Sequence, residues 1–500
     1  MAFLAAARQR HAPFLAIIWA CFTVLVLWVA HHHEPFSDEA QAWLLARDSS
    51  FFEMLFRRMH YEGSPALWHG MLWALVRLGA PFGSMSYLSA LLASLSALLV
   101  LFAAPFPPWL RGLFVFGYYP AYQYAVVARS YGLNVLLVTL AAILYPTRES
   151  KPLRYCLILA ALANANAFGF VVAVVLFLDF ALTSWKFRST RGKHYLISGI
   201  VFGIAAILAV AQASPAADVS FPPYHLITAG GVVTTIVVQI VRAFVEFPVP
   251  TPARMMISTI LSAGIVLVGF SLAARAKKLL LAISVCAAPL AFEAVKHFSA
   301  YHAGLIYLSW VFGIWISWPR VAGLSVRFRR TVIITTALIF AIHAYDTLAA
   351  WRTELNAPYS AGPQAAEFLQ SHFGTSPNPK LACVGVGTFS VQPYFSHNIC
   401  ANYFGGAPKP AYYIWKLGLA CPYIASEPYL EQLMRSGQYD VLLVSDQTLS
   451  GIKSQAVAHA TGYCAIRSFE GRIIWKDSFA YPDDMILFEK CGTEIPAHHK

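Results

Sequence analysis

Long apolar stretches recur along the chain from residue 13 to about residue 348, and no polar domain separates them. A helix that crosses a bilayer needs about 20 predominantly apolar residues. The stretches near this length are 13–30, 65–80, 84–104, 109–127, 131–146, 155–183, 195–213, 255–273, 279–294, 303–318 and 331–349. The pattern predicts a mostly α-helical, polytopic membrane domain of about 11 spans that covers residues 1–352.

Two stretches leave the pattern of spans open. Residues 155–183 form either one long helix or a tight hairpin that turns near Asn164, Asn166 and Gly169. The flanking charges favour the hairpin, whereas the parity of the spans favours the single helix. Residues 225–247 are apolar but hold Arg242 and Glu246, so we expect them at the outer interface and not across the bilayer.

After residue 352 the pattern changes, because polar residues become more frequent and the apolar runs shorten to strand length. The runs LACVGVG and YDVLLVSD alternate with helical patterns such as AAEFLQSHF and YLEQLMRSG, which predicts a small α/β domain over residues 353–500. Near its end, FEGRIIW and DMILFEKC are typical of a β-hairpin. Cys464 and Cys491 flank this segment and could pair in a disulfide.

The composition agrees with a membrane protein. Hydrophobic residues make up 58% of the chain and charged residues 12%, whereas a soluble domain carries about 25% charged residues. The net charge of +12 could suggest a nucleic-acid partner, but the Lys and Arg residues cluster in short loops, as the positive-inside rule describes. We therefore assign the charge to membrane topology and expect no nucleic acid as a partner.

Basic clusters set the expected orientation in the bilayer. They lie at 186–193, 275–278 and 320–330 and mark cytoplasmic loops. The first apolar stretch follows Arg8 and Arg10, and no small-residue cleavage site comes after it, which predicts an uncleaved signal anchor with a cytoplasmic amino end. Counting from these clusters, the last span runs outward.

The C-terminal domain is therefore expected on the extracytoplasmic side of a multi-pass protein of the inner (plasma) membrane. The use of cysteine agrees with this placement. Of the eight Cys residues, five fall in the last 120 or so positions, namely Cys383, Cys400, Cys421, Cys464 and Cys491. Such a concentration suits an oxidising compartment. Because five is an odd number, at least one of these thiols stays free.

The loop between the first two spans, residues 31–64, is rich in carboxylates. It holds six of the chain's 24 acidic residues, namely Glu34, Asp38, Glu39, Asp48, Glu53 and Glu62. Ser37 is a good helix N-cap, which would place Asp38 and Glu39 in the first turn of a helix. Ser50 and Glu53 have capping-box spacing, which predicts a second short helix. Two such helices on the membrane surface would hold their side chains at the level of the lipid headgroups.

The pair Asp38-Glu39 has two interpretations. Carboxylates are common in a first helical turn because the helix dipole favours them. Six carboxylates beside a bilayer, however, do not attract acidic lipids, so their density favours a chemical role. A carboxylate at this level can act as a general base that takes the proton from an acceptor hydroxyl as it attacks the anomeric carbon of a sugar. His60 and Glu62 are further candidates, whereas the run His31 to His33 is more typical of a solvated linker than of a metal site.

A transfer of this kind releases a lipid phosphate, which positive charge would stabilise. Arg129 in AVVARSYGL and the group Lys296, His297 and His302 in EAVKHFSAYHAGL lie at or near the ends of membrane segments. Ionisable residues at such places are candidates for function, and the alternative is that their side chains snorkel to the interface. Tyr131 and other polar neighbours of Arg129 favour a lined cavity there.

These motifs occur in a recognisable order. An acidic pair in PFSDEAQAW follows the first span, YEGSPALWHGMLWAL opens the second, and ARSYGL and HAGLIYL come later. In this order they resemble the GT-C superfamily of membrane glycosyltransferases, which includes protein O-mannosyltransferases and the enzymes that decorate lipid A with aminoarabinose. In that superfamily the second span opens with a Pro-Pro-Leu-like sequence, and Ala66 stands here for the second Pro. The resemblance covers about residues 1–350.

The resemblance implies a polyprenyl-phosphate-linked sugar donor, displacement with inversion, and Asp38 as the base. It implies that Glu39 either binds a metal, together with Asp38, or orients the acceptor, so a divalent metal cofactor stays open. Arg129, Lys296 and His302 would contact the donor phosphate. The C-terminal domain would bind the acceptor or cover the site. The acceptor, whether a glycan, a lipid or a protein, is not defined by the sequence.

Two other classes of function fit a polytopic chain with charged residues near its spans. A transporter or flippase of lipid-linked sugars also needs intramembrane charge, but such proteins usually show two related halves, and the sequence shows none. A non-catalytic subunit that assembles envelope polymers would use the C-terminal domain as a binding module. Loss of Asp38 would not matter for that last function.

Overall fold

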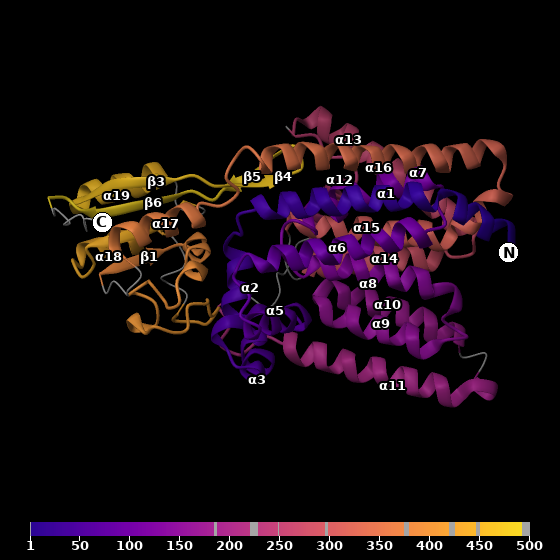
Figure 1. Cartoon of the computed structure of the whole chain (residues 1–500), viewed down its shortest axis with the longest axis horizontal. Helices are drawn as coiled ribbons and strands as arrows, with labels where there is room; N and C mark the ends of the chain where they lie inside the picture. Colours follow the sequence, from indigo (N-terminus) through magenta and orange to yellow (C-terminus); the bar gives the residue numbers. More distant parts are fainter. Residues whose placement is uncertain are drawn as a thin grey trace.

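The computed structural model describes residues 2–184, 188–220, 229–248, 250–295, 299–374, 380–419, 426–446 and 451–492. A bundle of long helices forms one end of the molecule, and a smaller region of helices and strands forms the other (Figure 1). The amino terminus lies at the far end of the bundle, and the carboxyl terminus lies in the smaller region. The fold therefore agrees with the predicted fold class, which is mostly helical with a small C-terminal α/β region.

Seven helices of the described residues are long and apolar enough to cross a membrane. They lie within α1 (Ala2–His32), α6 (Ser84–Ala103), α10 (Ala167–Ser184), α11 (Arg188–Ala213), α13 (Pro252–Arg275), α15 (Ala303–Ser317, extended by short turns at both ends) and α16 (Val326–Glu354). Four shorter apolar helices accompany them, namely α8 (Tyr131–Leu144), α9 (Pro152–Ala165), α12 (Ala229–Ala243) and α14 (Leu279–Val295). The chain is thus a multi-pass membrane protein, with seven full-length candidate spans where about 11 were predicted.

Two of the predicted spans are not continuous long helices. The stretch 65–80 contains α5 (Leu67–Arg77), whose 11 residues rise only about 16 Å, well short of a hydrocarbon core about 30 Å thick. The stretch 109–127 contains α7 (Pro108–Val115) followed by a π-helical turn (Tyr119–Gln123). Pro120 lies in that turn, and its missing backbone N–H interrupts a regular helix. Hydropathy alone does not reveal these breaks.

The stretch 155–183 is the hairpin, not the single helix. The helices α9 and α10 pack side by side and are separated only by Asn166, whose backbone is extended (φ −167°, ψ 175°). The Asn166 side chain accepts a hydrogen bond from the Gly169 amide at 2.8 Å and donates one to Ser130 Oγ at 3.2 Å. It therefore caps the start of α10 and ties the turn to the segment before α8.

The acidic loop 31–64 folds into short helices, as predicted. They are α2 (Ser37–Asp48), α3 (Phe51–Glu53), a π-helical turn (Met54–Arg58) and α4 (Met59–Glu62). The predicted cap at Ser50 is confirmed, because its Oγ accepts the Glu53 amide at 3.3 Å. The predicted cap at Ser37 is off by one residue. The N-cap is Phe36, and Glu39 supplies the capping bond by accepting the Phe36 amide at 3.1 Å.

The C-terminal region combines α17 (Gly362–Phe373), α18 (Glu427–Arg435) and α19 (Gly451–Thr461) with a four-stranded sheet in the order β1-β2-β6-β3. Strands β1 (Leu381–Val384) and β2 (Val441–Ser445) are parallel, while β6 (Met485–Lys490) runs antiparallel to both β2 and β3 (Tyr463–Phe469). The predicted disulfide Cys464–Cys491 is present, and Cys383–Cys400 forms a second one. Cys421 lies outside the described residues.

A separate hairpin joins the two parts of the molecule. Strand β4 (Arg472–Trp475) pairs with β5 (Ser478–Pro482), so most of FEGRIIW does not pair with DMILFEKC as predicted. Phe469, at the end of β3, does pair with Met485. The β4–β5 hairpin lies between the helical bundle and the four-stranded sheet, and it packs against the bundle (Figure 1). Trp475 Nε1 donates to Glu246 Oε2 at 2.7 Å, and Lys476 Nζ lies 3.7 Å from Glu246 and 3.8 Å from Asp346. The C-terminal region is therefore docked on the helices by buried polar contacts.

Candidate active site

A cavity of about 550 Å³ lies where the acidic loop, the segment before α8, the turn between α9 and α10, and two loops of the C-terminal region meet. Its wall combines carboxylates, cations and aromatic rings. The residues that line it include Asp38, Gln41, Glu62, Trp68, His69, Arg129, Tyr131, Phe168, Phe292, Tyr301, His302, Phe389, Tyr413 and Trp415. Five of the residues proposed from the sequence, which are Asp38, Glu62, Arg129, Tyr131 and His302, thus come together in one place.

Asp38 and Arg129 form an ion pair in this cavity. Asp38 lies in the first turn of α2 and Arg129 lies just before α8, and Arg129 Nη2 is 3.1 Å from Asp38 Oδ2. The Asp38 side chain keeps 40% of its surface exposed, so it stays accessible from the cavity. The Arg129 guanidinium is centred 4.2 Å from the Tyr301 ring and 5.2 Å from the Tyr131 ring. Two cation–π contacts and one carboxylate therefore fix the direction of this cation.

Glu62, the last residue of α4, supplies a second carboxylate to the cavity wall. Gln41 Nε2 donates to Glu62 Oε1 at 2.8 Å. Burial raises the pKa of Glu62 to about 7, with the Gln41 hydrogen bond opposing the shift and the charge of Asp38 adding to it. At neutral pH the cavity therefore contains one carboxylate paired with a cation and a second one that is close to its point of half-protonation.

The C-terminal region closes one side of the cavity. Val386, Phe389, Tyr413 and Trp415 all line it, although they are more than 300 residues from the acidic loop. Gln41 fixes this wall, because its Oε1 accepts the Tyr413 amide at 2.7 Å and its Nε2 donates to the Tyr413 carbonyl at 2.9 Å. A single amide side chain of α2 thus links the C-terminal region to Glu62.

His302 lies on the other side of the cavity. It comes directly before α15, its ring is 4.2 Å from the Phe168 ring, and its Nδ1 is 3.5 Å from Glu293 Oε1. It shares the wall with Tyr131 and Tyr301, whose rings lie 6.0 Å and 4.8 Å from the imidazole. This placement gives the cavity a second basic side chain beside Arg129.

The other sequence-predicted residues are not in the cavity wall. Glu39 is fully buried behind it and contacts His33 and two backbone amides. His60 lies at the surface, where its Nδ1 is 2.7 Å from the Ser214 carbonyl oxygen. Lys296 and His297 lie outside the described residues.

A metal bound jointly by Asp38 and Glu39 does not fit this arrangement. Asp38 faces the cavity and Arg129, whereas the Glu39 carboxylate faces His33 and the backbone. Within the described ranges, no group of three or more His, Cys, Asp or Glu side chains is arranged to hold a metal ion. We therefore derive no step that passes through a metal at this pair.

Several cavity residues were missed by the sequence reasoning. Gln41 could have been found, because it follows Asp38 by three residues and so lies on the same face of α2. Tyr301 could have been found beside His302. Tyr413 and Trp415 carry no signal in the sequence that connects them with the acidic loop.

The chain is similar to two solved structures over most of its length. ArnT from Cupriavidus metallidurans, solved bound to undecaprenyl phosphate, matches over 96% of this chain and 98% of its own, with 11% identity and a TM-score of 0.51. The arabinofuranosyltransferase AftD from Mycobacteria matches over 96% of this chain and 42% of its own, with 13% identity and a TM-score of 0.41. No protein-family model matches the chain, and no curated protein matches it.

The comparison with ArnT defines the class of fold. ArnT is a GT-C membrane glycosyltransferase, and the match covers nearly the whole of both chains. The chain therefore has an ArnT-like fold, which agrees with the fold that the resemblance drawn from the sequence implies. At 11% identity the match shows the fold alone.

Proposed function

We propose that the chain is an integral membrane glycosyltransferase. It moves a sugar from a polyprenyl-phosphate-linked donor to an acceptor hydroxyl on the extracytoplasmic face, with inversion at the anomeric carbon. The observation that carries the proposal is the Asp38–Arg129 pair, which places a carboxylate and a cation 3.1 Å apart in an aromatic-lined cavity. The ArnT-like fold supports it, since ArnT was solved bound to undecaprenyl phosphate.

In the proposed reaction Asp38 is the general base. It takes the proton of the acceptor hydroxyl while the acceptor oxygen forms a bond to the anomeric carbon from one face of the sugar. The bond from that carbon to the phosphate oxygen breaks on the opposite face, and its electron pair leaves with the lipid phosphate. Arg129 stabilises the charge that develops on that phosphate. Atoms and charge balance, because the acceptor proton ends on Asp38 and the lipid keeps its phosphate.

The Asp38–Arg129 ion pair suggests how the role of Asp38 as the base is linked to the role of Arg129 as the phosphate contact. Without a donor phosphate, the Arg129 guanidinium neutralises Asp38. A donor phosphate that binds Arg129 competes for the same guanidinium and leaves the Asp38 carboxylate free to accept a proton. His302 is placed to give the phosphate a second contact, and Glu62 is placed to hold the acceptor hydroxyl. The base would thus become available only when the donor is in place.

Other features support the extracytoplasmic side. Both disulfides lie in the C-terminal region, and disulfides persist in oxidising compartments. The basic clusters at 275–278 and 320–330 favour the opposite side for their loops. We therefore propose a catalytic membrane domain over residues 1–352 and an extracytoplasmic domain over residues 353–500 that closes the cavity.

The test is sugar transfer by the purified chain in lipid, with radiolabelled polyprenyl-phosphate sugars and a panel of glycan, lipid and peptide acceptors. Asp38→Asn should lower turnover about 10²- to 10⁴-fold, because it removes the base. Glu53→Gln is the matched control, since Glu53 belongs to the same loop but pairs with Arg58 away from the cavity. Full activity of Asp38→Asn would overturn the assignment of the base. Movement of the lipid-linked sugar across the bilayer without any transfer would instead favour a flippase.

A further inference from the structure

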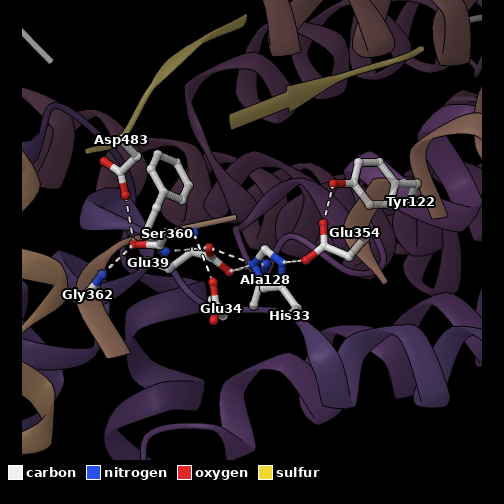
Figure 2. A network of polar contacts seen from close by, with 10 residues as sticks. His33, Glu34, Glu39, Tyr122, Ala128, Glu354, Ser360, Gly362 and Asp483 are labelled. Atoms are coloured by element: carbon white, nitrogen blue, oxygen red, sulfur yellow. Dashed lines mark hydrogen bonds and ion pairs between the residues drawn. The ribbon is translucent and has the colours of Figure 1, made fainter. Parts of the chain in front are cut away.

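A buried polar network lies behind the cavity and is centred on His33 (Figure 2). Nε2 of His33 is 3.0 Å from Glu39 Oε2, and its Nδ1 is 2.9 Å from Glu354 Oε1. The side chains of all three residues have no exposed surface. Glu354 is the last residue of α16, so the network joins the start of the acidic loop to the end of the last long helix.

The surroundings of His33 favour a protonated imidazole. Each ring nitrogen faces a side-chain carboxyl group, and a protonated imidazole can donate to both groups at once. Burial by itself would lower the pKa of His33, but the charges of Glu39 and Glu354 outweigh it and raise this pKa to about 10. His33 is therefore buried between two carboxyl groups, and it is not part of the solvated linker that the sequence suggested.

Glu39 also holds two backbone segments. Its Oε2 accepts the Phe36 amide at 3.1 Å, which fixes the start of α2, and its Oε1 accepts the Ala128 amide at 2.6 Å. Phe36 belongs to the turn that presents Asp38, and Ala128 is the residue before Arg129. One buried carboxylate thus contacts the backbone beside both members of the ion pair in the cavity.

Glu354 secures the same segment at a second point. The Tyr122 hydroxyl donates to Glu354 Oε2 at 2.5 Å, and Tyr122 lies in the π-helical turn that leads toward Ala128. The segment that carries Arg129 is therefore tied to the network by Tyr122 and by Ala128, and both ties end on carboxylates that share His33 (Figure 2).

We propose that Glu39 is a positioning residue, which together with His33 and Glu354 sets the distance and angle between Asp38 and Arg129. This inference rests on the proposed function and replaces a direct catalytic or metal-binding role for Glu39. In this proposal Glu39 has a structural role, and Asp38 carries out the chemistry.

Kinetics in two backgrounds test the proposal. Glu39→Gln should lower kcat/KM for sugar transfer about 100-fold, the loss expected from a misplacement of about 1 Å. In the Asp38→Asn background the same substitution should cost much less, because there is no longer a base to position. A purely structural residue would instead give the same fold-loss in both backgrounds. Glu431→Gln is the control, since Glu431 forms an exposed pair with Arg435 on α18 and should leave kcat/KM unchanged.

A milder variant covers the case in which Glu39→Gln does not fold. Tyr122→Phe removes one hydroxyl and keeps all three charges of the network. It should lower kcat/KM several-fold in the wild type and have no further effect in Asp38→Asn. Wild-type kcat/KM in folded Glu39→Gln, or equal losses in both backgrounds, would overturn the proposal.

A binding measurement separates this inference from the proposed function. Undecaprenyl phosphate is the probe and undecaprenol, which lacks the phosphate, is the control, with binding read by native mass spectrometry. Glu39→Gln should weaken binding of the phosphate lipid in the wild type and not in Arg129→Gln. If the wild type transfers no sugar, the proposed function fails. The binding measurement then tests the positioning role by itself. Equal weakening in both backgrounds would then overturn it.

Discussion

Helix α2 has two faces that differ in their exposure, and each carries one of the consecutive acidic residues Asp38 and Glu39. Asp38 is 40% exposed and faces a cavity with Arg129 and Glu62, whereas Glu39 is fully buried and faces His33. Neighbouring residues of an α-helix are about 100° apart, so they cannot both point into the same cavity. Two carboxylates that are adjacent in the sequence therefore point in different directions in the structure, and they have different roles.

The two sides also differ in how their charges are balanced. On the cavity side, Asp38 pairs with the Arg129 cation, and Glu62 accepts a hydrogen bond from the Gln41 amide. On the buried side, Glu39 has a cation and two backbone amides. A ligand can compete for the first set but cannot reach the second. The cavity side is adapted to exchange partners, and the buried side is adapted to keep them.

The largest effect is expected from breaking the buried side. His33→Ala leaves Glu39 and Glu354 without their shared cation, and loss of one member of a buried ion pair costs about 3–5 kcal/mol. The Tm in detergent, followed by intrinsic fluorescence, should fall by many degrees. His32→Ala is the control, because His32 is exposed and contacts Trp28 and His31 of its own helix. Equal Tm values for the two variants would contradict the buried-pair account.

The pH dependence of stability should distinguish the two sides. The folded-state pKa of His33 is raised to about 10 from an ordinary value of about 6.5, so its contribution to stability is complete below pH 6.5 and is lost as the pH rises toward 10. The wild-type Tm should therefore decline over this range. In His33→Ala this part of the decline should be absent.

On the cavity side, Arg129→Gln removes the cation that faces Asp38. Turnover should fall about 10²- to 10³-fold, the loss found when one stabilising donor is removed from a developing anion. The Tm should change less than it does in His33→Ala, because Arg129 is partly exposed to the cavity. A variant with normal turnover but a collapsed Tm would show that the ion pair is architectural.

Glu62→Gln should give a smaller effect, in a different pH window. The folded-state pKa of Glu62 is raised to about 7 from an ordinary value of 4.5, so protonation favours the folded state. Its contribution to stability is present below pH 4.5 and is lost as the pH rises through about 7. Glu62→Gln should remove the part of the Tm decline that falls in this lower window and leave the decline between pH 7 and 10. Unchanged Tm curves would contradict the raised pKa.

The smallest effect is expected from an exposed pair outside both sides. Lys416 Nζ lies 2.9 Å from Asp218 at the surface, and many exposed ion pairs contribute nothing measurable. Lys416→Ala should leave the Tm and the rate of sugar transfer unchanged within the scatter between replicates. A clear loss of transfer at an unchanged Tm would mean that this contact helps to hold the cavity wall formed by Trp415.

The sequence predicted the helical class, the acidic loop and the helix at its start, because hydropathy and capping depend on nearby residues. It also brought forward Asp38, Glu62, Arg129, Tyr131 and His302, which the structure collects in one cavity. Ionisable and polar side chains at the ends of apolar stretches are rare enough to stand out. The local signals were sufficient for these features.

The role of Glu39 could not be predicted in the same way. Its partners Ala128 and His33, and the Glu354 beyond them, come from three different places in the chain, up to 321 residues apart. Which of two adjacent carboxylates faces inward depends on those distant residues. The break of the helix at Asn166 is a milder case, since the hairpin was one of two alternatives and the capping bond to Gly169 decides between them.

The hairpin of β4 and β5 has a consequence for biogenesis. Glu246 and Asp346 belong to segments that are synthesised early, but Lys476 reaches them only when the end of the chain has been made and, in the proposed orientation, exported. Until then two carboxylates among the helices lack this cation. A chain truncated before residue 472 would lack this cation permanently. The β4–β5 hairpin would thus complete the charge balance of helices that were made long before it.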